Sequence, residues 1–122
     1  MKLLNDLFEV IETTVYEMGF ATSIKLNPGH IVYSGHFPGH PVTPGVIQMQ
    51  IVHELLEKYF GKSLKLITMA RCKFLKILDP TETSHIVVHI GFKRNDELLH
   101  VKARGENGTA IFFKLDPVYQ FV

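Results

Sequence analysis

Residues 28–45 restrict the fold of this chain more than any other segment, because they are crowded with proline and glycine. They hold four of the six prolines and four of the nine glycines. Proline fixes one backbone angle and lacks an N–H donor, and glycine favours turns, so these residues cannot continue a helix or a strand. We therefore expect a rigid, specifically folded loop.

A long apolar helix is predicted directly after this loop. Thr43 is a suitable N-cap, Pro44 suits the first helical position, and Gly61 suits the position just past the end. Apolar side chains cover most of the helix circumference, so this helix must be buried. They are Val46, Ile47, Met49, Ile51, Val52, Leu55, Leu56, Tyr59 and Phe60.

Most of the remaining chain has the pattern of β-strands. A short helix is expected over residues 1–6, and a turn is expected at Met18 and Gly19. The alternation of apolar and polar residues from His85 to Phe92 is typical of a sheet with one buried face. We predict strands at about residues 8–16, 20–27, 66–78, 85–93, 98–105 and 109–115.

The composition is that of one compact soluble domain. The 122 residues are 46% hydrophobic and 20% charged, with a formal net charge of +1, which predicts a single domain over residues 1–122 and disfavours a nucleic-acid binder. One helix and about six antiparallel strands favour an α+β fold in which a curved sheet wraps around the helix.

The cellular setting is predicted from cysteine usage and from the apolar runs. Cys72 is the only cysteine, so a disulfide within the chain and a cysteine-based zinc site are excluded, and we expect it to point inward as a buried thiol. No apolar run is long enough for a signal peptide or a membrane helix. We therefore expect a cytoplasmic protein that does not enter a membrane.

His36 is the first candidate for chemistry, because it lies on the loop just before the start of the helix. An imidazole exchanges protons near neutral pH, and a helix N-terminus offers N–H donors to an oxygen that gains negative charge. Removal of a proton next to a thioester carbonyl needs both. The alternative is that His36 is a structural histidine that holds the loop in place.

The string GHFPGHPVTPGVIQMQ, residues 35–50, resembles the signature of 3-hydroxyacyl-acyl-carrier-protein dehydratases of the FabA/FabZ type, which have the hotdog fold. The resemblance implies removal of water from a 3-hydroxyacyl thioester to give the trans-2-enoyl thioester, in fatty-acid or polyene-type lipid biosynthesis. It implies no cofactor beyond the phosphopantetheine of the acyl carrier protein. It also implies a homodimer or larger assembly, in which two sheets join and each active site draws residues from both chains. The matching residues are His36, Phe37, Pro38, Gly39, Pro41, Pro44 and Gly45.

Carried over by motif position, the resemblance assigns roles to individual residues. His36 takes the α-proton and later returns it, and the Gly45 N–H binds the thioester oxygen. Phe37, Pro38, Gly39 and Val46 contact substrate.

In the family, a carboxylate on the central helix of the partner chain handles the leaving hydroxyl. This chain departs from the pattern, because Gln50 stands at the position where the family has Asp or Glu. An amide cannot act as a general acid. Glu54 lies one turn further along the same helix face, so a relocated carboxylate acting through a water is one hypothesis. The other is that Glu54 is a solvated or salt-bridged residue and the site is catalytically weak. The Val46-Ile47-Gln48 segment is similar to that of dehydratase-like proteins of polyene pathways, which favours a specialised function.

A run of six basic residues without an acidic one lies between Lys58 and Leu78. It fits either a solvated sheet edge or, through Arg71 and Lys73, a docking surface for an acidic carrier protein. Phe37 and Phe74 line either an acyl channel or an ordinary core.

Two histidine pairs have four-residue spacing, His36 with His40 and His85 with His89. Neither spacing brings two rings together in a loop or on a strand, so we expect no metal site.

Two alternatives to the dehydratase remain open. One is a hotdog acyl thioesterase, in which a helix carboxylate such as Glu54 activates water. The other is a catalytically degenerate subunit that binds acyl chains or carrier protein and supports an active hotdog partner in a heterodimer, as Gln50 suggests.

Overall fold

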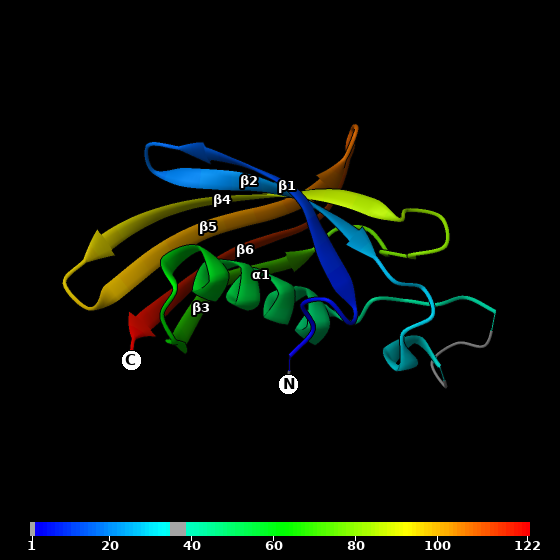
Figure 1. The fold of residues 1–122 in the computed structure, drawn as a ribbon, viewed down its shortest axis with the longest axis horizontal. Helices are drawn as coiled ribbons and strands as arrows, with labels where there is room; N and C mark the ends of the chain where they lie inside the picture. The colour runs from blue at the N-terminus through cyan, green and yellow to red at the C-terminus, as the bar shows by residue number, and fades with distance from the viewer. Residues whose placement is uncertain (1, 35–38) are drawn as a thin grey trace.

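The computed structural model describes residues 2–34 and 39–122. It contains one six-stranded antiparallel sheet and one long helix, α1 (Gly45–Phe60), which lies across one face of the curved sheet (Figure 1). The strand order in the sheet is β1-β2-β4-β5-β6-β3, so β1 and β3 are the two edge strands. The strands are β1 (Phe8–Tyr16), β2 (Gly19–Leu26), β3 (Leu64–Phe74), β4 (His85–Asn95), β5 (Leu98–Asn107) and β6 (Ala110–Phe121), and a short 3-10 helix, η1, spans Ile31–Tyr33.

The core lies between α1 and the inner face of the sheet. Ile51, Val52 and Leu56 on the helix are fully buried, and alternate residues of the central strands meet them. On β4, for example, Ile86, Val88 and Ile90 are buried, which confirms the predicted alternation. The predicted α+β arrangement, a curved sheet around one apolar helix, is therefore confirmed.

The sequence predicts the C-terminal end of α1 correctly but not its N-terminal cap. Gly61 adopts a left-handed conformation, with φ of 63°, and its N–H donates to the Glu57 carbonyl, as a C-terminal glycine should. At the other end the predicted cap is wrong, because Pro44 takes the N-cap position in extended conformation. Thr43 is instead buried, and its hydroxyl is hydrogen bonded to Tyr33 Oη at 2.9 Å.

The predicted helix over residues 1–6 is also wrong. Residues 2–7 form an irregular turn, in which the backbone amides of Leu3 and Leu4 donate to the carboxylate of Glu54. A tertiary contact thus takes amides that an isolated segment would have used within a helix.

Several strand limits differ from those expected, and so does the position of Cys72. The first turn is formed by Glu17 and Met18, and β2 already begins at Gly19, where an added Cβ would collide with the Ile90 carbonyl. The last strand continues to Phe121 instead of ending near residue 115. Cys72 is exposed rather than buried, because it lies on the edge strand β3, where most side chains face solvent.

Within residues 2–34 and 39–122, no helix has the length and hydrophobicity needed to cross a membrane.

Candidate active site at the start of α1

The N-terminus of α1 opens onto a small cavity. Pro44 directs the chain into the helix, and the first turn is formed by uncharged residues beginning with Gly45. The cavity, of about 320 Å³, is lined by residues 42–45, Gln48 and residues 74–78. The first backbone N–H groups of a helix have no partner within the helix, so this end can donate to an oxygen that gains negative charge.

Gly45 allows a strand to approach this helix end closely. A Cβ at position 45 would lie 2.6 Å from Cε2 of Phe74, at the end of β3. The aromatic ring therefore rests directly on the first residue of α1. Phe74 lines the cavity, as an acyl-channel residue would.

A network of hydrogen bonds behind the cavity fixes the loop that leads into α1. The Thr43 N–H donates to the Leu78 carbonyl at 2.9 Å, and the Thr43 carbonyl accepts from Gln48 Nε2 at 2.9 Å. Burial raises the pKa of Tyr33, the hydrogen bond with Thr43 works against this, and the charge of Asp79 adds to it. Tyr33 is therefore a neutral hydroxyl at physiological pH, suited to holding Thr43.

Gln50 and Glu54 lie on a different side of α1. Gln50 Nε2 donates to Glu54 Oε2 at 2.8 Å, which confirms that the two side chains share a helix face. The Leu3 and Leu4 amides also donate to Glu54, each at 2.8 Å. Glu54 is only 7% exposed, so the description of it as a solvated residue is wrong.

These two side chains line a second cavity, of about 380 Å³, together with residues from the N-terminal segment and the next turn of α1. Gly45 does not line it. Within one chain the structure therefore brings Gln50 and Glu54 together but keeps them apart from the helix N-terminus.

Three of the residues expected to contact substrate or to act in catalysis, His36, Phe37 and Pro38, lie outside the described residues. Gly39 is exposed, with φ of 83°. Val46 is exposed on the first turn of α1.

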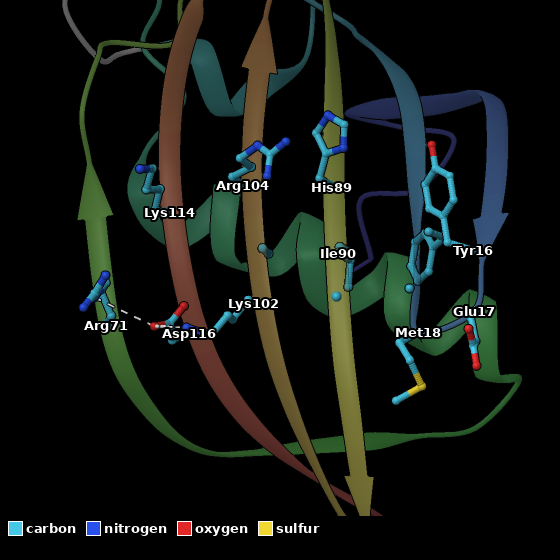
Figure 2. A pocket seen from close by; sticks show the side chains of 14 residues that line it. Tyr16, Glu17, Met18, Arg71, His89, Ile90, Lys102, Arg104, Lys114 and Asp116 are labelled. Carbon is cyan, nitrogen blue, oxygen red and sulfur yellow. Dashed lines mark ion pairs between the residues drawn. The ribbon is translucent and has the colours of Figure 1, made fainter.

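A third and larger cavity, of about 720 Å³, lies on the face of the sheet opposite α1, and Figure 2 shows its lining side chains. Arg71 on β3 pairs with Asp116 on β6, and Lys102 on β5 approaches the same carboxylate at 3.7 Å. The cavity continues to the turn between β1 and β2.

Basic side chains on this face align across four strands. Residues directly opposite in an antiparallel pair share a face, and the register pairs Lys73 with Lys114, Lys114 with Arg104, and Arg104 with His89. Figure 2 shows three of these four at the same level on neighbouring strands. We call Arg71, Lys73, Lys102, Arg104 and Lys114 the basic face.

Sequence reasoning found only Arg71 and Lys73 of this basic face. The other members lie on strands distant in sequence, which the strand pattern alone does not bring together. A signal was present on β5, where Lys102 and Arg104 alternate with the buried Val101 and Ala103.

Glu106 on β5 binds two side chains of this face. His89 Nε2 lies 2.7 Å from Glu106 Oε1, and Arg104 Nε donates to Glu106 Oε2 at 3.3 Å. Burial alone would raise the pKa of Glu106, but the hydrogen bonds and charges of His89 and Arg104 outweigh it and hold that pKa below its usual value.

Among the residues that the structure describes, no group of three or more His, Cys, Asp or Glu side chains is arranged to hold a metal ion. His85 is hydrogen bonded to Ser84, and His89 to Glu106.

The single helix wrapped by a curved antiparallel sheet defines a hotdog-fold protein, and comparison with known proteins refines this class. A family model described as ApeI-like, ApeI dehydratase, matches residues 12–111, and the chain belongs to this family.

The solved structures agree on the fold. The dehydratase heterocomplex ApeI:P of Xenorhabdus doucetiae superimposes with a TM-score of 0.73 at 18% identity, covering 91% of this chain and 96% of that one. A putative thioesterase of Shewanella oneidensis superimposes with a TM-score of 0.60 at 12% identity, covering 96% and 84%.

Curated relatives support the resemblance stated from residues 35–50. The 3-hydroxyacyl-[acyl-carrier-protein] dehydratase FabZ of Rickettsia rickettsii is 36% identical over 62 residues, or 44% of this chain and 43% of that protein. FabZ of Rickettsia bellii is 33% identical over 70 residues, or 51% and 48%. The chain thus spans less than half the length of the curated relatives it matches.

Proposed function

We propose that this protein removes water from a 3-hydroxyacyl thioester on acyl carrier protein and forms the trans-2-enoyl thioester. The observation that carries the proposal is the cavity where Gly45 opens α1 beneath the Phe74 ring. The dehydratase family supports it. The substrate arrives on phosphopantetheine in the cytoplasm, and the protein itself holds no cofactor.

The proposed reaction uses the helix N-terminus and the preceding loop. The Gly45 N–H donates to the thioester oxygen, which lowers the energy of the negative charge that develops there. His36 takes the proton from the α-carbon, and the C3–O bond breaks as the double bond forms. The imidazolium of His36 returns the proton to the departing hydroxyl, which leaves as water.

Gln50 changes how the leaving group is handled. Its amide cannot supply a proton, so we assign proton return to His36 and give Gln50 of the partner subunit a positioning role. Glu54 fixes the Gln50 amide through the 2.8 Å hydrogen bond. The commitment of Glu54 to the Leu3 and Leu4 amides argues against the relocated carboxylate and against a thioesterase that uses it to activate water.

The test is turnover of a 3-hydroxyacyl carrier-protein substrate by the wild type, His36→Ala and Gln50→Glu, with the enoyl product and free thiol both followed. The proposal requires enoyl product from the wild type and its loss in His36→Ala. Free thiol without enoyl product would identify a thioesterase instead.

Gln50 also favours a second candidate, a subunit that supports an active hotdog partner. In that case the wild type is silent alone, and activity appears on co-expression with the partner or in Gln50→Glu. The relative ApeI:P is itself described as a heterocomplex.

We further propose that the basic face binds the acidic carrier protein. Lys73 is adjacent in the chain to Phe74 on the edge strand β3 but points to the opposite face of the sheet, so the phosphopantetheine arm of a carrier docked there would reach around this edge to the cavity at Gly45. Lys73 and Lys114 are like charges directly opposite each other, an arrangement that is unfavourable without an anionic partner.

The docking proposal is tested with the double variant Arg71→Glu, Lys73→Glu. The Michaelis constant should rise for carrier-bound substrate and stay unchanged for a short thioester. Lys25→Glu with Lys62→Glu makes the same charge change elsewhere and should alter neither value. Equal effects on both substrates would refute docking at this face.

A further inference from the structure

Gln48 carries a buried hydrogen-bond acceptor to which none of the described residues donates. The side chain is 3% exposed, and among the described atoms its Oε1 has no hydrogen-bond partner. Its Nε2 donates to the Thr43 carbonyl at 2.9 Å. Exchanging the amide oxygen and nitrogen would set two carbonyl oxygens against each other, so this bond fixes which atom is Oε1.

The residue that carries this acceptor lines the same cavity as the helix N-terminus. Gly45 and Gln48 both line it. Residues three apart lie on one side of a helix, about 5–6 Å from each other. The cavity therefore combines N–H donors at the start of α1 with one acceptor on the following turn.

An unpaired buried acceptor is unfavourable, and folded proteins seldom retain one without a reason. The hydrogen bond to the Thr43 carbonyl accounts for the amide nitrogen of Gln48, but among the described residues nothing donates to its oxygen. A ligand that brings an O–H group into the cavity would satisfy Gln48 Oε1.

We infer that Gln48 Oε1 accepts a hydrogen bond from the C3 hydroxyl of the bound 3-hydroxyacyl thioester, whose carbonyl oxygen is held by the Gly45 N–H. This inference rests on the proposed function. A 3-hydroxy thioester offers an acceptor at C1 and a donor at C3, the complement of the donor at Gly45 and the acceptor at Gln48. Gln48 is thus a residue that selects substrates bearing the hydroxyl.

The same contact separates substrate from product. The enoyl product has lost its O–H donor, so it leaves Gln48 Oε1 unpaired and binds more weakly than the substrate. Gln48 therefore assists product release.

The experiment measures binding without turnover, in the His36→Ala protein, by calorimetry. Three N-acetylcysteamine thioesters are compared: 3-hydroxybutanoyl, 3-methoxybutanoyl and butanoyl. We expect the hydroxy compound to bind about 5- to 150-fold more tightly than either analogue that lacks the donor. Adding Gln48→Met, which keeps the length of the side chain, should reduce this ratio to near one. Gln120→Met, at an exposed position on β6, should leave it unchanged.

Two results would overturn the inference. Equal affinities for the three thioesters in the protein with Gln48 intact would mean that the hydroxyl is not read there. An equal loss for all three in Gln48→Met would mean that Gln48 only supports Thr43. If Gln48→Met does not fold, Gln48→Leu, which also lacks the acceptor, takes its place.

These outcomes are separable from failure of the proposed function. A wild type that makes no enoyl product but retains the affinity ratio would disprove dehydration and leave the hydroxyl contact standing.

Discussion

Two glycines of this protein lie against phenylalanine rings, and the rings differ in their freedom to move. Gly45 faces Phe74, which is 44% exposed at the end of an edge strand. Gly105 faces Phe113, which is fully buried in the core.

Adding a methyl group at each glycine should therefore have unequal effects. Gly105→Ala should lower the free energy of unfolding by about 1–3 kcal/mol, because Phe113 cannot move without disturbing the core. Gly45→Ala should cost less than about 1 kcal/mol, since Phe74 can swing outward. Urea unfolding of both variants provides the measurement, and equal losses would contradict this account.

At the scale of single residues, the sequence predicts which side chains share a helix face, but it does not predict their burial or hydrogen-bond partners. Gln50 and Glu54 were placed on one helix face from their spacing, and the hydrogen bond between them confirms it. The burial of Glu54 could not be predicted, because it depends on the Leu3 amide, 51 residues away in the chain. Oε1 of Gln48, which has no donor within residues 2–34 and 39–122, likewise takes its place from the fold of the loop around Thr43, which spacing does not encode.

At the scale of elements, the N-terminal segment is hydrogen bonded to α1 through one carboxylate, that of Glu54. Glu54→Gln should lower the free energy of unfolding by about 1–3 kcal/mol, because charged acceptors bind amides more strongly than neutral ones. Hydrogen exchange should speed up at Leu3 and Leu4 while the remaining core stays protected.

Glu57→Gln is the matched control, since Glu57 accepts instead from the Leu64 amide at the start of β3. Faster exchange should then appear at Leu64 and not at Leu3. Loss of protection at the same amides in both variants would rule out this separation of roles.

The β4–β5 pair carries a pH-dependent contact at Glu106, which faces His89 and Arg104. Because the folded protein lowers the pKa of this carboxyl, the contact stabilises the fold above the unfolded pKa, near 4.3, and its contribution is lost as the pH falls through the folded pKa.

Glu106→Gln should therefore reduce stability at pH 7 by up to about 1 kcal/mol and have no effect at about pH 3. Thermal melts across this range measure the difference, with the exposed Glu97→Gln as control. A difference that grows as the pH falls would have the wrong sign for this mechanism.

At the scale of the whole molecule, both edge strands expose apolar side chains, and on β1 these are Ile11, Val15 and Tyr16. On the other edge, β3 exposes Leu66 and Ile67, and Phe74, Leu75 and Ile77 are exposed where they line the cavity at the start of α1. An uncovered edge with this much apolar surface favours pairing with a second sheet. Because the β3 edge also borders the cavity at Gly45, we place the proposed subunit contact there.

A matched pair of isoleucines tests that placement. Ile67 on β3 and Ile11 on β1 are 47% and 53% exposed, and each lies at an irregularity of its edge strand. Ile67→Glu should convert the assembly to a monomer in light scattering, whereas Ile11→Glu should leave its mass unchanged. The opposite result would assign the contact to β1.

The overall architecture was predictable because local signals agreed with one another. The loop of residues 28–45, the apolar helix after it and the alternating strands together specified a sheet around one helix. The position of β3 beside β6 was not predictable, because strand order depends on pairing between distant segments. For that reason the exposure of Cys72 and the assembly of the basic face emerged only from the structure.

Because the ring of Phe74 lies on Gly45, a fluorescent side chain at position 74 would report on the cavity. The chain contains no tryptophan, so Phe74→Trp would introduce its only indole, against the first residue of α1. Indole emission shifts to shorter wavelength when water leaves its surroundings. Ligand entry beside Gly45 would then shift the fluorescence of a single indole to shorter wavelength, with no chemical label attached.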